Sequence, residues 1–384
     1  MIYYGKQSID DEDVKAVEEV LRSDFLTQGP AVERFERAVA DYCGAKYAVA
    51  VCNATAALHI ACLSTGLGEG DLLWTSPITF VASANCGRYC GADVDFVDID
   101  QKTYNMSVTA LEEKLRRTRR DNHLPKVVVP VHLAGQSCDM ARIKELSEEY
   151  NFTVIEDASH AVGADYLNTK VGSCAFSDMA VFSFHPVKII TTGEGGMVLT
   201  NRKDLYEKLR LYRSHGITRD LSKMTRESDG AWYYQQIELG CNYRMTDIQA
   251  ALGSSQMTRL DTFVARRREL AARYDELLRD LPLITPYVME GANPSWHIYV
   301  VRVLFDQICK TKQQIFEEMK EREIVLNLHY IPVHRQPYYE ELGFRQGDFP
   351  ESEKYYEEAF TLPLYYDITN DEQNRIVEAL RSIL

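Results

Sequence analysis

Short apolar runs alternate with amphipathic stretches between Leu72 and Leu199, and this alternation constrains the fold more than any other feature of the sequence. The apolar runs are LLWTS, DVDFVDI, KVVVPVHL, FTVIEDA, MAVFSF and GMVLTN. Helical segments such as ALEEKLRRTRR and MARIKELSEEY lie between several of them. Apolar strands joined by helical segments are typical of a parallel sheet that is covered on both faces. We therefore expect an α/β fold with a mostly parallel sheet.

The segments on either side of this region suggest two domains. Before it, VERFERAVADYC and ATAALHIACLSTGL have helical patterns and enclose a short strand, YAVAVC. After it, the run from Met245 to Asp280 is predicted to form one long helix that leaves the large domain. Strands near HIYVVRVLF and IVLNLHY and a final helix, EQNRIVEALRSIL, would form a smaller α/β domain. A chain of 384 residues is longer than a single small hydrophobic core can accommodate. We therefore expect a large domain over 1–255, with an N-terminal arm, and a small domain over 256–384.

The charge and the cysteines limit the expected partners and compartment. A chain with a formal charge of −14 repels nucleic acid and anionic membranes at long range, so we expect neither as a partner. No apolar stretch is long enough to cross a bilayer, and the N-terminal segment lacks the pattern of a secretory signal. The nine cysteines are scattered without a CxxC pair, which indicates reduced thiols in a cytoplasm. Neither Cys86 with Cys90 nor His329 with His334 has the further ligands of a metal site, so no metal is expected.

Three segments at strand ends or helix starts carry candidate chemistry, because open α/β sheets bind ligands at these places. The first is Asn53-Ala54-Thr55-Ala56-Ala57, which follows YAVAVC and opens a helix. Free backbone amides at a helix start favour a phosphate group, and small side chains let it approach closely. The alternative is an ordinary helix cap made by Asn53 or Thr55, and the segment alone favours that alternative.

The second segment ends in Asp157, after the apolar run FTVIEDA. A carboxylate that emerges from a buried strand needs a cation or hydrogen-bond donors, since an unpaired buried charge is costly. A protonated pyridine nitrogen is one such partner, and the pairing keeps the ring an electron sink. A cap or an ion pair with an arginine is the alternative, and His160 three residues later is more often a core histidine than a ligand.

The third segment, SFHPVKIITTGEGG, places Lys188 in a loop between two apolar strands. Its neighbours Val187 and Ile189 form an apolar setting that lowers the pKa of an amine and frees it for Schiff-base chemistry. The hydroxyls of Ser183, Thr191 and Thr192 are near enough in sequence to help bind a phosphate. The GEGG run lacks the GK[ST] ending of a nucleoside triphosphate loop. Taken alone, a lysine is more often a surface residue.

The three segments occur in the order found in pyridoxal phosphate (PLP) enzymes with the aspartate-aminotransferase fold, with Lys188 31 residues after Asp157. Longer blocks strengthen this likeness: LTQGPAVERFERAVADYCGAKYAVAVCNATAALHIA, SPITFVASAN, VIEDASHAVGA, VFSFHPVKIITTGEGGMVLTN, LRLYRSHGI and NYRMTDIQAALGSSQM. Together they resemble the sugar aminotransferases of the DegT/DnrJ/EryC1/StrS family. The resemblance implies PLP fold type I, with a seven-stranded sheet in the large domain. One branch of the family replaces the Schiff-base lysine with histidine and removes a hydroxyl group, but Lys188 argues against that branch.

The resemblance also implies a role for each matching residue. Lys188 would hold the cofactor as a Schiff base and then move a proton between cofactor and sugar, while Asp157 would pair with the ring nitrogen. Phe80 would stack on the ring and His160 would lie beside it near the 3′-oxygen. The phosphate would be held by Ala54, Thr55, Ala56 and Ser183, and by Asn242 of a neighbouring subunit. The active unit would then be a homodimer with shared sites.

Within the family, LTQG, SPITFVASAN, VDIDQKTYN and HYIPVHRQPYY resemble the branch that acts in pseudaminic acid biosynthesis. This likeness implies amino transfer, with L-glutamate as the donor, to C4 of a UDP-4-keto-6-deoxy-N-acetylhexosamine, namely UDP-4-keto-6-deoxy-L-AltNAc. The residues implied in binding the nucleotide sugar are Tyr4, Asp24, Phe25, Leu26, Thr27, Leu328, His329, Tyr330 and Ile331. Three alternatives stay open: another 3-keto or 4-keto nucleotide sugar, a free keto-cyclitol, and a PLP-binding regulatory protein.

Overall fold

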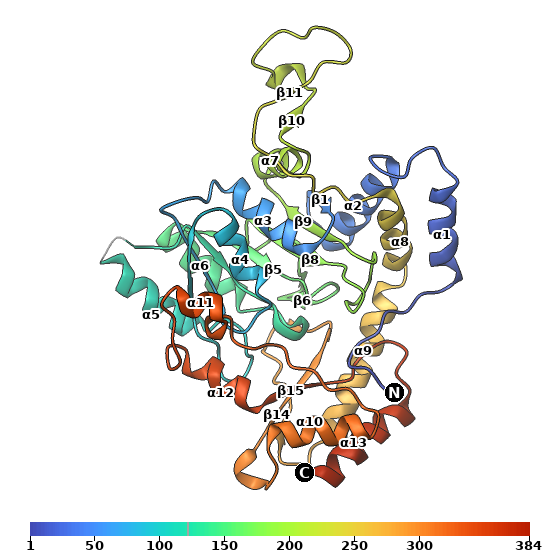
Figure 1. Cartoon of the computed structure of the whole chain (residues 1–384), viewed down its shortest axis with the longest axis vertical. Coiled ribbons are helices and arrows are strands. Elements are labelled where there is room, and N and C mark those ends of the chain that lie inside the picture. The colour runs from blue at the N-terminus through green and yellow to red at the C-terminus, as the bar shows by residue number, and fades with distance from the viewer. Residues whose placement is uncertain (121–122) are drawn as a thin grey trace.

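A seven-stranded sheet forms the centre of the computed structural model, which describes residues 1–120 and 123–384 (Figure 1). Its order is β1-β9-β8-β5-β4-β2-β3. The strand bounds are β1 Tyr47–Val51, β2 Leu72–Thr75, β3 Asp93–Phe96, β4 Val127–Val129, β5 Thr153–Asp157, β8 Met179–Ser183 and β9 Gly196–Thr200. β9 pairs antiparallel with both of its neighbours, and the other pairs are parallel. The predicted fold class, a mostly parallel sheet in an α/β fold, is confirmed.

Helices cover both faces of this sheet because successive strand residues point to opposite sides. Ala48 and Ala50 of β1 pack into a core that also includes Phe35, whereas Val49 and Val51 pack into a second core that includes Leu58. α2 (Pro30–Cys43) and α8 (Asp247–Met257) contribute to the first core, and α3 (Ala54–Ser64), α4 (Ala82–Tyr89) and α7 (Lys203–Arg213) contribute to the second. A further cluster lies under α5 (Val108–Arg119) and α6 (Met140–Tyr150).

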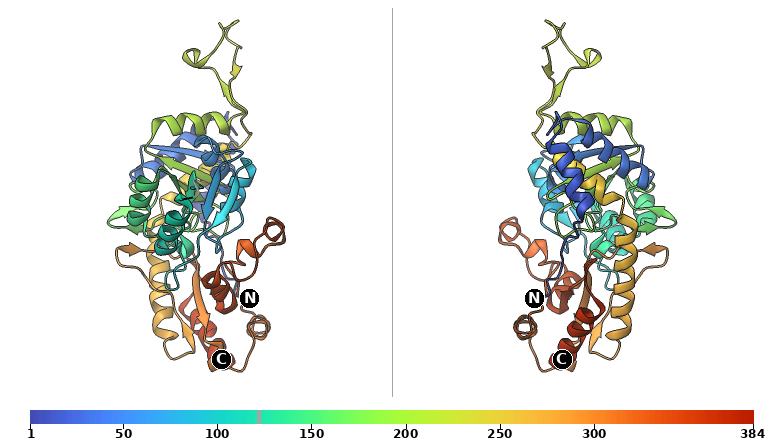
Figure 2. Two further views of the ribbon diagram at one scale, coloured as in Figure 1. Left: turned by 90° about the vertical axis from the view of Figure 1, so that its left-hand side faces the viewer. Right: turned by 90° about the vertical axis from the view of Figure 1, so that its right-hand side faces the viewer.

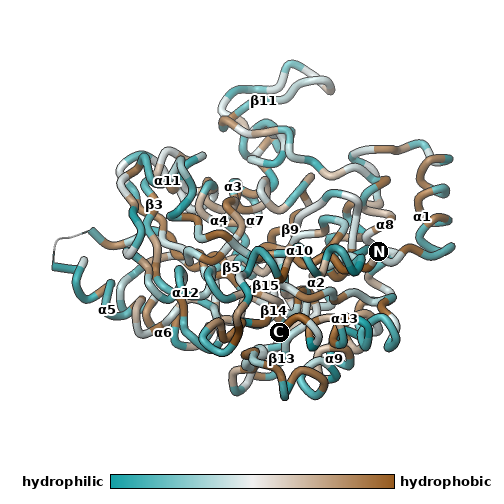
Figure 3. Tube along the Cα trace, turned by 60° about the horizontal axis from the view of Figure 1, so that its bottom comes forward, coloured by the Kyte–Doolittle hydropathy of each residue, from teal (hydrophilic) through white to brown (hydrophobic). Residues whose placement is uncertain are grey.

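The run from Met245 to Asp280 was predicted as one helix, and that prediction is wrong. The structure has two helices, α8 and α9 (Leu260–Leu277), because Arg259 leaves the helical conformation. Its guanidinium group forms ion pairs with Asp10 and Asp13, which lie at the start of helix α1 (Asp11–Leu21). These ion pairs join residues that are far apart in sequence, so hydrophobic periodicity did not indicate them. Figure 3 shows hydrophilic and hydrophobic residues alternating along α1.

The C-terminal part of the chain forms a three-stranded antiparallel sheet with three helices against it. The strands are β12 (Leu283–Ile284), β14 (Tyr299–Val303) and β15 (Ala359–Leu362), and the helices are the later part of α9, α10 (Lys312–Glu321) and α13 (Asn370–Ile383). The segment IVLNLHY is not the expected strand, since it makes only isolated bridges, Ile2 with Ile324 and Asn327 with Thr361. β15, which pairs with β14, was not predicted. The division of the chain at residue 255 stays a prediction.

Smaller elements complete the described chain. The additional short strands are β6 (Asp165–Tyr166), β7 (Thr169–Lys170), β10 (Ile217–Thr218), β11 (Gln235–Gln236) and β13 (Ala292–Asn293), and the additional helices are α11 (Pro337–Glu341) and α12 (Pro350–Glu358). The paired strands β10 and β11 carry a hairpin that projects well beyond the rest of the molecule (Figures 1 and 2). Trp232, in the segment between its two strands, and Leu239, shortly after β11, are both exposed. No helix in the described part of the chain is both long enough and apolar enough to cross a membrane.

Arg267 of α9 is a buried cation that connects three segments of the C-terminal part. Its guanidinium group donates to the carbonyl oxygens of Trp296, His297 and Leu364, at 3.2, 3.1 and 3.0 Å. Burial lowers the pKa of Arg267 to about 10, so the group is still charged at neutral pH.

We predict that Arg267→Leu lowers the free energy of unfolding by about 3 kcal/mol or more, because three buried carbonyl groups lose a charged donor. Thermal unfolding followed by circular dichroism measures the change. The control is Arg279→Leu, which alters an exposed arginine just beyond the same helix and is expected to have little effect. An equal, small change in both variants would contradict the prediction.

Candidate functional site

A cavity of about 630 Å³ lies at the carboxyl edge of the central sheet. β1, β2, β4, β5 and β8 all end near it, and α3 and α4 begin there. Eleven of the residues singled out from the sequence line the cavity: Tyr4, Ala54, Thr55, Phe80, Asp157, His160, Ser183, Lys188, Leu328, His329 and Tyr330. The others, namely Asp24, Phe25, Leu26, Thr27, Ala56, Asn242 and Ile331, do not line it in the single chain. The parallel topology thus gathers residues from separate parts of the sequence.

The start of α3 has both features that its sequence suggested, a helix cap and free amides for a phosphate. The Asn53 side chain caps the helix by accepting from the Ala56 amide at 2.8 Å, so Ala56 has no amide free for a phosphate. Ala54 and Thr55 occupy the first two helical positions, where an amide has no partner inside the helix, and both line the cavity. Gly196 allows the approach of β9, since a Cβ atom at this position would lie 2.5 Å from the backbone of Asn53.

Of the three hydroxyls that lie near Lys188 in the sequence, only that of Ser183, the last residue of β8, belongs to a residue that lines the cavity. The Thr191 hydroxyl donates to the Phe184 carbonyl at 3.1 Å, and the Thr192 hydroxyl donates to the Glu194 carbonyl at 2.7 Å. These two threonines therefore stabilise the turn between β8 and β9, and the suggestion that they help bind a phosphate is not supported by their contacts.

Asp157, the last residue of β5, is a buried carboxylate without an ion pair to any described residue. It accepts hydrogen bonds from the Ser83 hydroxyl at 2.5 Å and from the Ser159 amide at 3.2 Å. A buried carboxylate of this kind calls for a cationic partner. Because Asp157 also lines the cavity, a protonated ring nitrogen of a bound ligand would fit this requirement.

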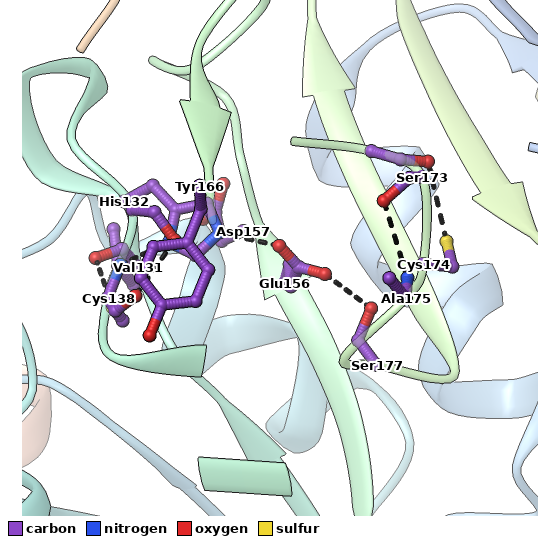
Figure 4. A network of polar contacts seen from close by, with 12 residues as sticks. Val131, His132, Cys138, Glu156, Asp157, Tyr166, Ser173, Cys174, Ala175 and Ser177 are labelled. Carbon is purple, nitrogen blue, oxygen red and sulfur yellow. Dashed lines mark hydrogen bonds and ion pairs between the residues drawn. The ribbon is translucent and has the colours of Figure 1, made fainter. Parts of the chain in front are cut away.

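The backbone and the opposite face of β5 hold Asp157 in place. Its amide donates to the Pro130 carbonyl at 2.9 Å, and its carbonyl accepts from the His132 amide at 3.0 Å. On the neighbouring residue, the Glu156 carboxylate lies 2.7 Å from His132 Nε2 and also accepts from the Ser177 hydroxyl (Figure 4). These contacts connect three segments below the cavity, so the end of β5 is firmly positioned.

Lys188 lies in the loop after β8 with its amine turned into the cavity. Burial lowers the pKa of Lys188 to about 8, and the Asp157 carboxylate partly offsets this effect. The nearest hydrogen-bond partner of its Nζ is His297 Nε2, at 3.3 Å. An amine with this pKa is available in its neutral, nucleophilic form at a much lower pH than an ordinary lysine.

Three aromatic side chains form the wall around the lysine. His160 Nδ1 accepts from the Ala134 amide at 3.3 Å, and Nε2 lies 3.0 Å from the Tyr330 hydroxyl. His329 Nδ1 lies 2.8 Å from the Thr361 hydroxyl, and burial lowers the pKa of His329 to about 3. Both rings are therefore neutral at neutral pH, since burial and the Lys188 charge also lower the pKa of His160.

Phe80 lies at the opening of this cavity, and Tyr330 faces it. The Phe80 side chain is 57% exposed, and its ring centroid lies 6.2 Å from that of Tyr330. An exposed aromatic ring that lines the cavity offers a stacking surface for a planar ligand.

The sequence did not single out Ser83 and His297. Ser83 lies in the block SPITFVASAN, one turn after Phe80, but its bond to Asp157 joins residues that are 74 positions apart in the sequence. His297 lies two residues before β14 and enters the cavity from the C-terminal part of the chain. No local sequence pattern indicated either contact.

The remaining predicted residues lie elsewhere on the chain. Asp24 and Phe25 line a separate surface cavity of about 660 Å³ between α1, α2 and α8. Asn242 forms a backbone bridge with Ser214 near the base of the projecting hairpin. Ile331 is 45% exposed beside the cavity residue Tyr330.

Known proteins match this chain over nearly its whole length. The model of the DegT/DnrJ/EryC1/StrS aminotransferase family matches residues 7–381. The spore coat polysaccharide biosynthesis protein SpsC of Bacillus subtilis is 39% identical over 384 residues, covering 99% of this chain and 96% of that protein. The UDP-4-amino-4,6-dideoxy-N-acetyl-beta-L-altrosamine transaminase of Campylobacter jejuni is 35% identical, covering 100% and 98%. The solved structure of Helicobacter pylori PseC, an aminotransferase involved in the biosynthesis of pseudoaminic acid, has a TM-score of 0.89 at 31% identity and covers 100% and 98%.

The cavity fits the cofactor of this family. It offers a lysine amine with a lowered pKa, a buried carboxylate without a cationic partner, and free amides at a helix start for a phosphate. The fold expected for such enzymes is also present, since the solved relative matches the whole chain. The chain therefore belongs to the DegT/DnrJ/EryC1/StrS aminotransferase family, and it is a PLP-dependent sugar aminotransferase.

Proposed function

We propose that this aminotransferase transfers an amino group from L-glutamate to C4 of UDP-4-keto-6-deoxy-L-AltNAc, a step of pseudaminic acid biosynthesis. The observation that carries the chemical part is the placement of the Lys188 amine and the Asp157 carboxylate in one cavity with the start of α3. The substrate part rests on the likeness to the Campylobacter jejuni transaminase and to PseC. SpsC, at 39% identity, favours a second candidate, namely another keto sugar nucleotide used for a polysaccharide.

Residues of the cavity would hold the cofactor at both ends. The amides of Ala54 and Thr55 and the Ser183 hydroxyl would bind its phosphate, where the positive end of the α3 dipole favours an anion. Asp157 would keep the proton on the ring nitrogen, with Ser83 fixing the carboxylate. When bound, PLP would carry the amino group between donor and acceptor, and its ring would supply the electron sink for this chemistry.

Lys188 and the aromatic residues would act on the sugar. The Lys188 amine would bind PLP covalently between turnovers and then move a proton to and from the sugar carbon, which suits a group whose pKa is near the working pH. His160 and Tyr330, joined by their hydrogen bond, would orient the reacting groups. Tyr4 and the stretch 328–330 would contact the nucleotide sugar from the outer side of the cavity.

A second copy of the chain would complete the site. Asn242 and the stretch 24–27 do not line the cavity of their own chain, and Asn242 lies near the base of a hairpin that projects from the molecule (Figure 1). We propose a homodimer in which Asn242 of one subunit reaches the phosphate bound by Thr55 and Ser183 of the other. Such sharing supplies a further hydrogen-bond donor to a phosphate dianion in an acidic protein.

The substrate prediction is tested by a product assay with the purified, PLP-loaded enzyme. We expect L-glutamate to support amination of UDP-4-keto-6-deoxy-L-AltNAc with a kcat/KM at least about tenfold above that for the other sugars, a difference of about 1.4 kcal/mol. The panel contains epimeric 4-keto and 3-keto UDP- and dTDP-sugars. Preference for another keto sugar would support the second candidate, and product mass and NMR decide between them.

The role of Asp157 predicts a large loss of rate in Asp157→Asn. Without the carboxylate the ring nitrogen loses its proton and the cofactor becomes a poorer electron sink, so kcat should fall by about two orders of magnitude or more. Circular dichroism should be unchanged. The matched control is Asp93→Asn, at the exposed start of β3, for which kcat should stay near that of the parent enzyme. Near-normal turnover in Asp157→Asn would make this carboxylate purely structural.

Shared sites predict recovery of activity when two inactive variants are mixed. Lys188→Ala and Asn242→Asp are refolded together in equal amounts, and half of the dimers should then contain one chain of each kind. One site of each mixed dimer has both defects and the other has neither, so about a quarter of the parental activity should return. Mass spectrometry of intact dimers verifies subunit exchange. Proven exchange without recovered activity would show that each chain builds its site alone.

A further inference from the structure

His297 is a buried residue of the cavity to which the proposed chemistry gives no role. Its side chain is 3% exposed, its Nε2 lies 3.3 Å from Lys188 Nζ, and its ring centroid lies 4.4 Å from that of His160. Its other ring nitrogen, Nδ1, is buried without a hydrogen-bond partner among the residues that the structure describes. The ring therefore makes one side-chain hydrogen bond there, and that bond is to the lysine amine.

The backbone around His297 is held from several sides. Its amide donates to the Ala134 carbonyl at 3.0 Å, and its carbonyl accepts from the buried Arg267 guanidinium at 3.1 Å. The preceding residue, Trp296, has a φ of 53°, which is an uncommon conformation for a bulky side chain. The close approach of this segment also depends on Gly135, because a Cβ atom there would lie 2.7 Å from Ser295 Oγ. These contacts fix His297 beside the lysine.

The direction of the hydrogen bond follows from the two groups. A lysine ammonium has three donors and no acceptor, so the Lys188 ammonium donates and His297 Nε2 accepts. The ring proton is then on Nδ1. Burial and the charge of Lys188 hold the pKa of His297 well below its usual range, so the ring stays neutral and keeps a lone pair for the amine.

Other titratable groups share the cavity with Lys188, and they do not replace His297. These are Tyr4, Asp157, His160, His185, Glu194, His329 and Tyr330. Among the described residues, only His297 has a side-chain atom within hydrogen-bond distance of Lys188 Nζ. A neutral acceptor has a particular advantage here, because a carboxylate at the same distance would strongly favour the ammonium form and hinder release of its proton.

We infer that His297 is a positioning residue for the lysine: it accepts a hydrogen bond from the Lys188 ammonium and thereby holds the amine in place and retains its proton until the sugar carbon receives it. The inference rests on the proposed role of Lys188 as the proton carrier. It assigns His297 no contact with the sugar.

The test measures the protonation of Lys188 directly in the cofactor-free protein. Trace labelling with acetic anhydride at a series of pH values, read by peptide mass spectrometry, gives the pKa of Lys188 from its rate of acetylation. We expect about 8 in the parent protein, and a value about one unit lower in His297→Phe, because the ammonium form loses its acceptor. His297→Gln offers an acceptor oxygen at a similar reach, so the pKa of Lys188 in this variant should lie close to that of the parent protein. His185→Phe, which removes another imidazole from the cavity, is the matched control and should leave the value near 8.

A second readout separates positioning from a loss of fold. In the PLP-loaded enzyme, the pH profile of kcat for His297→Phe should move to lower pH because the pKa of Lys188 is lower. In His297→Gln the profile should lie close to that of the parent enzyme. An unchanged or raised Lys188 pKa in His297→Phe would overturn the inference, as would a fall in kcat without any shift of the pH profile. If circular dichroism shows that His297→Phe is misfolded, His297→Leu takes its place with the same expectations. Labelling uses neither sugar nor cofactor. Its result therefore tests the role of His297 even if the enzyme does not aminate the proposed sugar.

Discussion

The placement of one partly buried amine and one buried carboxylate in the same cavity is the constraint on which the site depends. Lys188 and Asp157 share a cavity, yet neither forms an ion pair with a described residue. Burial lowers the pKa of the lysine, and the carboxylate is stabilised by two hydrogen bonds instead of by a cation. Such an arrangement is unfavourable for stability, because buried charges without partners are costly. It is suited to a cofactor that brings a positive ring nitrogen and a reactive carbonyl to the two groups.

The architecture of the sheet explains how these groups come together. Strands that run in the same direction deliver their C-terminal residues to one edge, and here that edge receives Ser183, Asp157 and the start of α3. The antiparallel strand β9 does not break this pattern, since it returns the chain after the lysine loop and packs tightly on Asn53 through Gly196. The sequence family and the solved relatives agree with this arrangement, because the match extends over nearly the whole chain.

Local features of the sequence predicted the elements whose structure is determined locally. All seven strands of the central sheet were recognised, six as continuous apolar runs and β3 as an alternation of acidic and apolar residues, and the strand-end placement of Asp157 and Lys188 followed from them. The break between α8 and α9 was missed because it depends on ion pairs of Arg259 with the distant α1. The contact of His297 with Lys188 joins segments 109 residues apart, and no periodicity indicates such a pairing. The roles of Asn242 and of the stretch 24–27 stay predictions, because a single chain does not bring them to the cavity.

The course of α9 has a consequence for how the molecule unfolds. Leu260, Phe263 and Val264 at its beginning pack into the core under the central sheet. Further along, Leu270 and Tyr274 pack into the core of the C-terminal part, which also contains Ile2 from the opposite end of the chain. Because α9 belongs to both cores, unfolding of one core removes part of the packing that stabilises the other. Heating should therefore melt the chain in one cooperative transition, although its length would allow two.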